Sequence, residues 1–131
     1  MLIQPEKILP SQDFLKPETI NYIFTCIKKG ELEKLPPSPI VRKDGSGNFI
    51  AIDGHNLIAV KLSLGENVDV HLASSPDDGL PTDSEANVKR NEDLKEKFET
   101  VIRDSSHLRE SGVTTFNDLI GRYEDLFLQA K

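Results

Sequence analysis

Residues 48–65 constrain the fold more than any other stretch, because they join a strand to an apolar helix through a short turn. Residues 49–52 are apolar and rich in β-branched side chains, which is typical of a strand. Residues 54–64 are apolar on most sides and therefore predict a helix that other elements largely enclose. Gly65 supplies a natural end for that helix. We accordingly expect an α+β fold built around this strand and this helix.

Further elements are expected on both sides of this segment. Pro17 suits the first position of a helix and Gly30 its end, with apolar residues at helical spacing between them. The glycines of residues 44–47 supply the turn of an antiparallel hairpin. In chain order, the expected elements are a short strand at 7–10, a helix at 17–29, strands at 40–43 and 48–52, the helix at 54–64 and a strand at 68–72.

A polar, turn-rich segment then interrupts the regular pattern. We expect residues 1–74 to form a small mixed sheet with packed helices, residues 75–84 a linker, and residues 85–131 a C-terminal helical extension. Thr82 and Ser84 are candidate N-caps for the first helix of this extension.

The extension contains two further local signals. Its first helix carries apolar residues as far as Leu108 and is expected to break near Ser105-Ser106 or near Ser111-Gly112. Thr115 with Asp118 resembles a capping box, and an apolar stripe follows at helical spacing. These helices could lie over the sheet, or they could mediate self-association or contact a protein partner, and the sequence does not choose between these arrangements.

Charge and cysteine content exclude several classes of function. Cys26, the single cysteine, rules out an internal disulfide and a cysteine-based zinc cluster. The net charge of -6 disfavours DNA as a partner, because nucleic-acid binding depends on many Lys and Arg residues. No apolar run is long enough to cross a bilayer, and the first residues lack the pattern of a secretion signal. We therefore expect a cytoplasmic protein without a membrane partner.

The turn Asp53-Gly54-His55-Asn56 is the one place where the sequence suggests chemistry. Gly54 allows a ligand to approach the backbone, and the N–H groups and positive dipole of a helix start favour phosphate or carboxylate. Asp53 could orient His55 or hold a metal, and His55 could act as acid, base or phosphate ligand. A simpler alternative makes Asp53 a helix N-cap, Gly54 a turn residue and His55 a polar residue of the first helical turn.

Residues 39–65 resemble the ParB/sulfiredoxin superfamily, on the strength of Ile50-Ala51-Ile52-Asp53-Gly54-His55-Asn56, the apolar helix and Gly65. The expected element order over residues 1–74 is similar too. In that superfamily the turn is written DGHHR, GERR or GCHR and binds nucleotide phosphates. The resemblance implies a ParB/sulfiredoxin-like fold, with ATP, ADP or CTP and magnesium as cofactors. Gly54, His55 and Asn56 would then contact the phosphate.

The chain departs from the family pattern at three places. Leu57 stands where the family has an arginine, which removes a charge and the best phosphate ligand of the turn. His55 stands where sulfiredoxin has its catalytic cysteine, so sulfiredoxin chemistry is not expected. The free-serine kinases share Asp53-Gly54-His55, but the glutamate that they use as base aligns with Gln12. The neighbouring Asp13 is then the candidate base.

Two classes of function remain open. In the first, the chain binds a nucleotide or a small phosphorylated ligand, with Asp13, Asp53 and His55 as candidate catalytic residues. Whether it is an enzyme is left open, and an active one would be a phosphotransferase or a nucleotide hydrolase. In the second, it is a non-catalytic interaction module with a degenerate ligand site. Burial of Leu57 under the C-terminal helices would favour the second class.

Overall fold

A four-stranded mixed sheet forms the centre of the chain, in a computed structural model that describes residues 1–130. The strands in spatial order are β2 (Ile8–Leu9), β4 (Phe49–Asp53), β3 (Ile40–Lys43) and β6 (His71–Leu72). Strand β4 pairs antiparallel with β3 and parallel with β2, while β6 pairs parallel with β3. The expected hairpin and the general α+β class are therefore confirmed.

The strand expected at 68–72 is divided between two sheets. Its first part, β5 (Val68–Asp69), pairs antiparallel with β1 (Leu2–Ile3), which the sequence did not predict. Its second part, β6, pairs with β3, and the buried Val70 lies between the two parts. Alternation of apolar and polar residues identifies an extended segment but not its partner, which explains why a single strand was expected.

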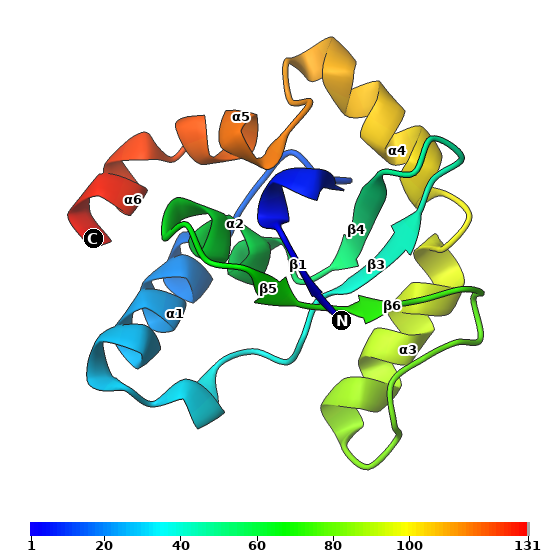
Figure 1. The fold of residues 1–131 in the computed structure, drawn as a ribbon, viewed down its shortest axis with the longest axis horizontal. Helices are drawn as coiled ribbons and strands as arrows, with labels where there is room; N and C mark the ends of the chain where they lie inside the picture. The colour runs from blue at the N-terminus through cyan, green and yellow to red at the C-terminus, as the bar shows by residue number, and fades with distance from the viewer. Residues whose placement is uncertain (131) are drawn as a thin grey trace.

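One face of the sheet is covered by four helices, α1 (Pro17–Lys29), α2 (His55–Ser63), α5 (Phe116–Gly121) and α6 (Glu124–Ala130) (Figure 1). Both α1 and α2 occupy the residues expected from the sequence to within one position. The Thr115–Asp118 capping box is present, and the stripe that follows it packs Phe116, Leu119 and Phe127 into the same core as α1 and α2. The C-terminal helices thus bury their apolar stripe within the chain.

The opposite face is covered by α3 (Glu85–Lys97) and α4 (Val101–Leu108) (Figure 1). A second core forms there between the sheet and these helices, made by Ile40, Ile50, Ile52, Ala73, Leu94, Phe98 and Val101. Among residues 1–130, short 3-10 helices also lie at Pro5–Lys7, Leu32–Lys34 and Arg109–Ser111. The helices of the expected extension therefore contribute to the cores on both faces of the sheet.

The first helix of the extension breaks earlier than the sequence predicted. It ends at Lys97, next to Phe98, whereas Ser105 lies buried inside α4. Arg42, from β3, donates from Nη1 to the Phe98 carbonyl oxygen (2.6 Å) and holds its guanidinium 4.0 Å above the Phe98 ring. This contact joins the end of α3 to a distant strand, and no local signal in the sequence predicts it. A later helical stretch does end at Gly112, whose backbone is left-handed.

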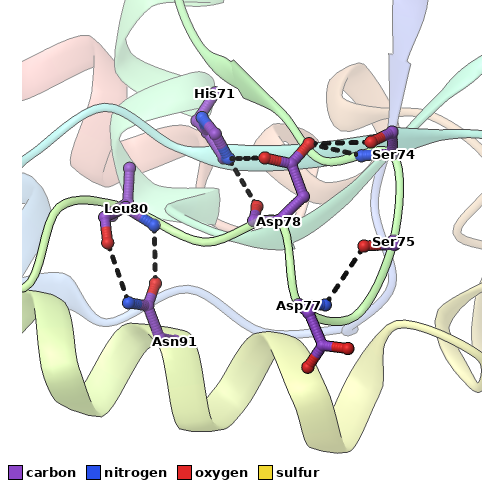
Figure 2. A network of polar contacts seen from close by, with 7 residues as sticks. All are labelled: His71, Ser74, Ser75, Asp77, Asp78, Leu80 and Asn91. Atoms are coloured by element: carbon purple, nitrogen blue, oxygen red, sulfur yellow. Dashed lines mark hydrogen bonds and ion pairs between the residues drawn. The ribbon is translucent and has the colours of Figure 1, made fainter.

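Side chains from both flanking elements hold the segment expected to be a linker (Figure 2). His71 donates from Nε2 to the Asp78 carbonyl oxygen (2.7 Å), and Ser74 donates two bonds to the Asp78 carboxylate (both 2.9 Å). The bonds from Ser74 keep the pKa of Asp78 below its ordinary value. Asn91 of α3 exchanges two hydrogen bonds with the backbone of Leu80. The segment is thus tied to β6 on one side and to α3 on the other.

Candidate functional site

The turn between β4 and α2 has a backbone that only glycine tolerates well. Gly54 is the N-cap residue of α2, with φ 91°. A Cβ at this position would lie 2.6 Å from the Cβ of Pro39, which is far inside contact distance. Because Gly54 has no side chain, the first N–H groups of α2 receive no side-chain cap from it. These donors and the positive end of the helix dipole lie at the turn.

A pocket of about 480 Å³ opens at this turn, a volume within the usual range for small-molecule sites. Residues 53–57 line one side, and the start of α1 contributes its N-cap residue Lys16 and Thr19 of its first turn. The remaining lining residues come from the preceding loop, the proline connector and one face of α3, and they are Gln12, Phe14, Pro36, Pro37, Lys89, Arg90, Asp93 and Lys97. The turn of residues 53–56, which the sequence analysis identified as a candidate site, therefore lies at an open cavity.

Asp53 is held by an ion pair instead of capping α2. Its Oδ2 atom accepts from Nε of Arg90 (2.6 Å), and its Oδ1 atom accepts from the backbone N–H of Gly54 (2.9 Å). The side chains of Arg90 and Asp53 are 11% and 33% exposed, so the pair is partly desolvated. In the simpler alternative, the role of Asp53 as N-cap is wrong, because Gly54 occupies that position and the Asp53 carboxylate is paired with Arg90. The other two parts agree with the structure, since Gly54 lies in the turn and His55 in the first turn of α2.

Positive charge is concentrated around the pocket. Four basic side chains line it, from Lys16, Lys89, Arg90 and Lys97, against the two carboxylates of Asp53 and Asp93. The whole chain, in contrast, carries a net charge of -6. Such a local excess of cations beside a helix start attracts anions from an otherwise acidic surface.

The His55 side chain points into the protein core. It is only 3% exposed, its ring packs 5.6 Å from that of Phe116, and its Nε2 atom accepts from the backbone N–H of Ser11 (3.0 Å). Burial lowers the pKa of His55 to about 3, opposed by the charge of Asp53 and assisted by that of Lys97. The imidazole is therefore neutral near neutral pH and is engaged in a structural hydrogen bond with Ser11.

Asn56 and Asp13 lie in different surroundings. The Oδ1 atom of Asn56 accepts from the backbone N–H of Lys16 (2.9 Å), which joins the starts of α1 and α2. Asp13 is exposed and does not line the pocket, and its carbonyl oxygen accepts a long bond from Arg122 (3.5 Å). The structure thus brings residues 53–56 together at the pocket but leaves Asp13 outside it.

Leu57 is buried without closing the pocket. It is 6% exposed and belongs to the core shared with the C-terminal helices, as the second class of function expects. It also lines the pocket, alongside Pro36 and Pro37, and the cavity beside it remains open. The burial of Leu57 therefore favours the second class of function, as stated above, whereas the open cavity beside it favours the first.

The pocket residues of α3 were not predicted from the sequence. Lys89, Arg90 and Lys97 lie more than thirty positions beyond the turn, in a helix whose charged residues are typical of an exposed surface. Arg90 follows Lys89 by one residue and Lys97 follows it by eight, which places the three side chains on one helical face. This shared face is the only sequence signal that links them. Within residues 1–130 no group of three or more His, Cys, Asp or Glu side chains is arranged to hold a metal ion.

Comparison with known proteins identifies no relative: no protein-family model, no curated protein and no solved structure matches the chain. In the described residues, every helix is too short or too polar to cross a membrane.

Proposed function

We propose that this chain is a ParB/sulfiredoxin-like domain that binds a nucleotide or another small phosphorylated ligand at the turn between β4 and α2. The observation that carries the proposal is the open pocket at the glycine-capped start of α2. Backbone N–H groups at a helix start, together with the helix dipole, make a ready site for phosphate. The order of β2, α1, the β3–β4 hairpin and α2 supports the family assignment.

The surroundings of the pocket support an anionic ligand. Lys16, Lys89 and Lys97 can neutralise phosphate charge at its mouth, because all three are exposed and lie on the pocket lining. Phe14 and the two prolines at 36 and 37 supply apolar surface for the uncharged part of a ligand. The pocket therefore offers both a charged and an apolar side.

The side chains support binding better than catalysis. The neutral, buried imidazole of His55 is a poor acid or base near neutral pH, and Asp13 lies outside the pocket. Both carboxylate oxygens of Asp53 already accept hydrogen bonds, which does not suit a magnesium ligand. Asp93 is the other carboxylate on the lining, so magnesium, if it binds, would depend mainly on the ligand's own phosphates.

Calorimetric titration of the folded chain with ATP, ADP, CTP and inorganic phosphate, with and without magnesium, tests the proposal. We expect saturable binding of at least one of these ligands, weakened by added salt because surface cations contribute. Lys89→Glu should weaken it about tenfold, since an exposed cation becomes an anion at the pocket. Lys95→Glu is the matched control, because Lys95 lies on the same helix but outside the pocket.

Two results would contradict the proposal. One is the lack of binding heat for all four ligands while circular dichroism shows a folded chain. The other is an equal effect of the Lys89 and Lys95 substitutions, which would mean that the ligand responds to overall charge and does not occupy the pocket.

A further inference from the structure

Phe14 differs from the other phenylalanines of the chain in its exposure. The chain has six phenylalanines, and Phe14 is 46% exposed, whereas the other five are buried in the two cores or at their edges. Phe14 also lines the pocket at the start of α2. A singly exposed apolar side chain is ordinary on a protein surface, so exposure alone assigns no role. The backbone around Phe14 and the charges of the pocket supply two further observations.

Hydrogen bonds hold the loop that carries Phe14. Its carbonyl oxygen accepts from Nε2 of Gln12 (2.9 Å). The backbone N–H groups of the next two residues donate to side chains far along the sequence, one to the Tyr123 hydroxyl oxygen (3.1 Å) and the other to Oδ1 of Asn56 (2.9 Å). Because this backbone is already held in place, a ligand that contacts Phe14 loses little free energy to ordering the loop.

Phe14 shares the pocket with groups that suit phosphate. Lys16 is two residues further along the chain, and two residues span at most about 7 Å. The Lys16 backbone is bonded to Asn56 in the first turn of α2, so the loop lies beside the start of that helix. Lys89 and Lys97 line the same pocket from α3. A ligand in this pocket therefore meets an exposed aromatic residue as well as cations.

We propose that Phe14 stacks on the base of a nucleotide whose phosphates lie among the lysines at the start of α2. This inference rests on the proposed function and narrows its ligand to nucleoside phosphates, because a base-free phosphate has no planar ring to stack. Every base has a π face, so stacking favours nucleotides as a class and does not choose among ATP, ADP and CTP.

The test compares nucleotides with a phosphate ligand that lacks a base. ATP, CTP and tripolyphosphate, each with magnesium, are titrated into the folded chain by calorimetry, and we expect at least one nucleotide to bind about tenfold more tightly than tripolyphosphate. Phe14→Leu keeps an apolar side chain but removes the ring. It should weaken nucleotide binding about tenfold and leave tripolyphosphate binding unchanged.

A matched control is available on α1. Tyr22 is 49% exposed but does not line the pocket, so Tyr22→Leu should bind nucleotides and tripolyphosphate like the unmodified chain. Phe14 is likewise half exposed, so its substitution should leave the fold intact, which circular dichroism checks.

A second measurement reports stacking directly. The chain has no tryptophan, so Phe14→Trp introduces a single fluorophore at the pocket. This variant should bind nucleotides at least as tightly as the unmodified chain, and saturating nucleotide should quench its emission, because a larger ring stacks on the base. Tripolyphosphate should leave the emission unchanged. The emission of Tyr22→Trp, outside the pocket, should not respond to either ligand.

Three results would overturn this inference and leave the proposed function standing. They are tripolyphosphate binding as tight as nucleotide binding, an equal loss of both in Phe14→Leu, and unchanged emission of Phe14→Trp while calorimetry shows bound nucleotide. A folded, unmodified chain that binds none of these ligands and no inorganic phosphate would instead overturn the proposed function itself.

Discussion

The Nε atom of Arg90 and the Oδ2 atom of Asp53 lie 2.6 Å apart, joining residues separated by 37 positions in the sequence. The contact connects the middle of α3 to the last residue of β4, directly beside the glycine that starts α2. It therefore couples a helix of the C-terminal extension to the turn that forms the candidate site. We make four predictions from this geometry and from the packing around it.

The first prediction concerns the energetic coupling of this pair. Arg90→Gln should destabilise the chain by about 1–3 kcal/mol, because it leaves the partly buried Asp53 carboxylate without its charged donor. A third of the Asp53 side chain remains exposed, so solvent screening keeps the loss below that of a fully buried pair. Urea denaturation of Arg90→Gln, Asp53→Asn and the Asp53→Asn/Arg90→Gln double variant measures the energetic coupling between the two residues. Strictly additive effects would contradict a direct interaction.

The second prediction compares two glycines with similar backbones. Gly54→Ala should cost about 2–4 kcal/mol, because a left-handed backbone and a clash with Pro39 act together. Gly47→Ala should cost only about 1 kcal/mol, because Gly47 has φ 87° but no atom within 4 Å of its added Cβ. Thermal and urea unfolding of both variants test this. Equal losses would mean that the contact with Pro39 is unimportant.

The third prediction concerns pH. The folded chain keeps His55 unprotonated down to about pH 3, while the unfolded chain protonates it below its ordinary pKa of about 6.5. Acid therefore favours the unfolded state, and the contribution of His55 should lower stability by about 2 kcal/mol between pH 7 and pH 5. His55→Gln removes this titration while keeping an acceptor for the Ser11 N–H.

Urea denaturation of the unmodified chain and of His55→Gln across this pH range provides the measurement. The difference in their free energies of unfolding should shrink as the pH falls, because only the unmodified chain loses the His55 contribution. The other two histidines, His71 and His107, are common to both proteins and cancel. A constant difference would show that His55 is not buried in its neutral form.

The fourth prediction concerns the segment between β6 and α3. Asn91→Ala should destabilise the chain by about 1–3 kcal/mol, because it leaves the partly buried N–H and carbonyl of Leu80 without their side-chain partner. It should also speed proteolysis within residues 75–84, which Asn91 holds against α3 (Figure 2). Glu92→Ala, at the next and exposed position, should change stability by less than about 0.5 kcal/mol.

The sequence by itself determined the elements whose signals are local. Pro17 and Gly30 bound α1, residues 44–47 turn the hairpin, and Thr115 with Asp118 caps α5, as expected. Each of these signals acts through steric limits or hydrogen bonds within a few residues. For the same reason the sequence placed a turn and a helix start at Gly54, since its neighbours set that geometry.

Only the tertiary structure decided which distant groups meet at that turn. It divided the strand at 68–72 between two partners and joined the end of α3 to Arg42. It brought Arg90 to the pocket beside a turn that itself carries the uncharged Leu57. It also buried His55 in the core, which removed its charge. Such pairings depend on the burial of apolar faces against one another. The sequence shows that a charged residue lies on an amphipathic helix, but it does not predict which partner the packing of that helix will place beside the residue.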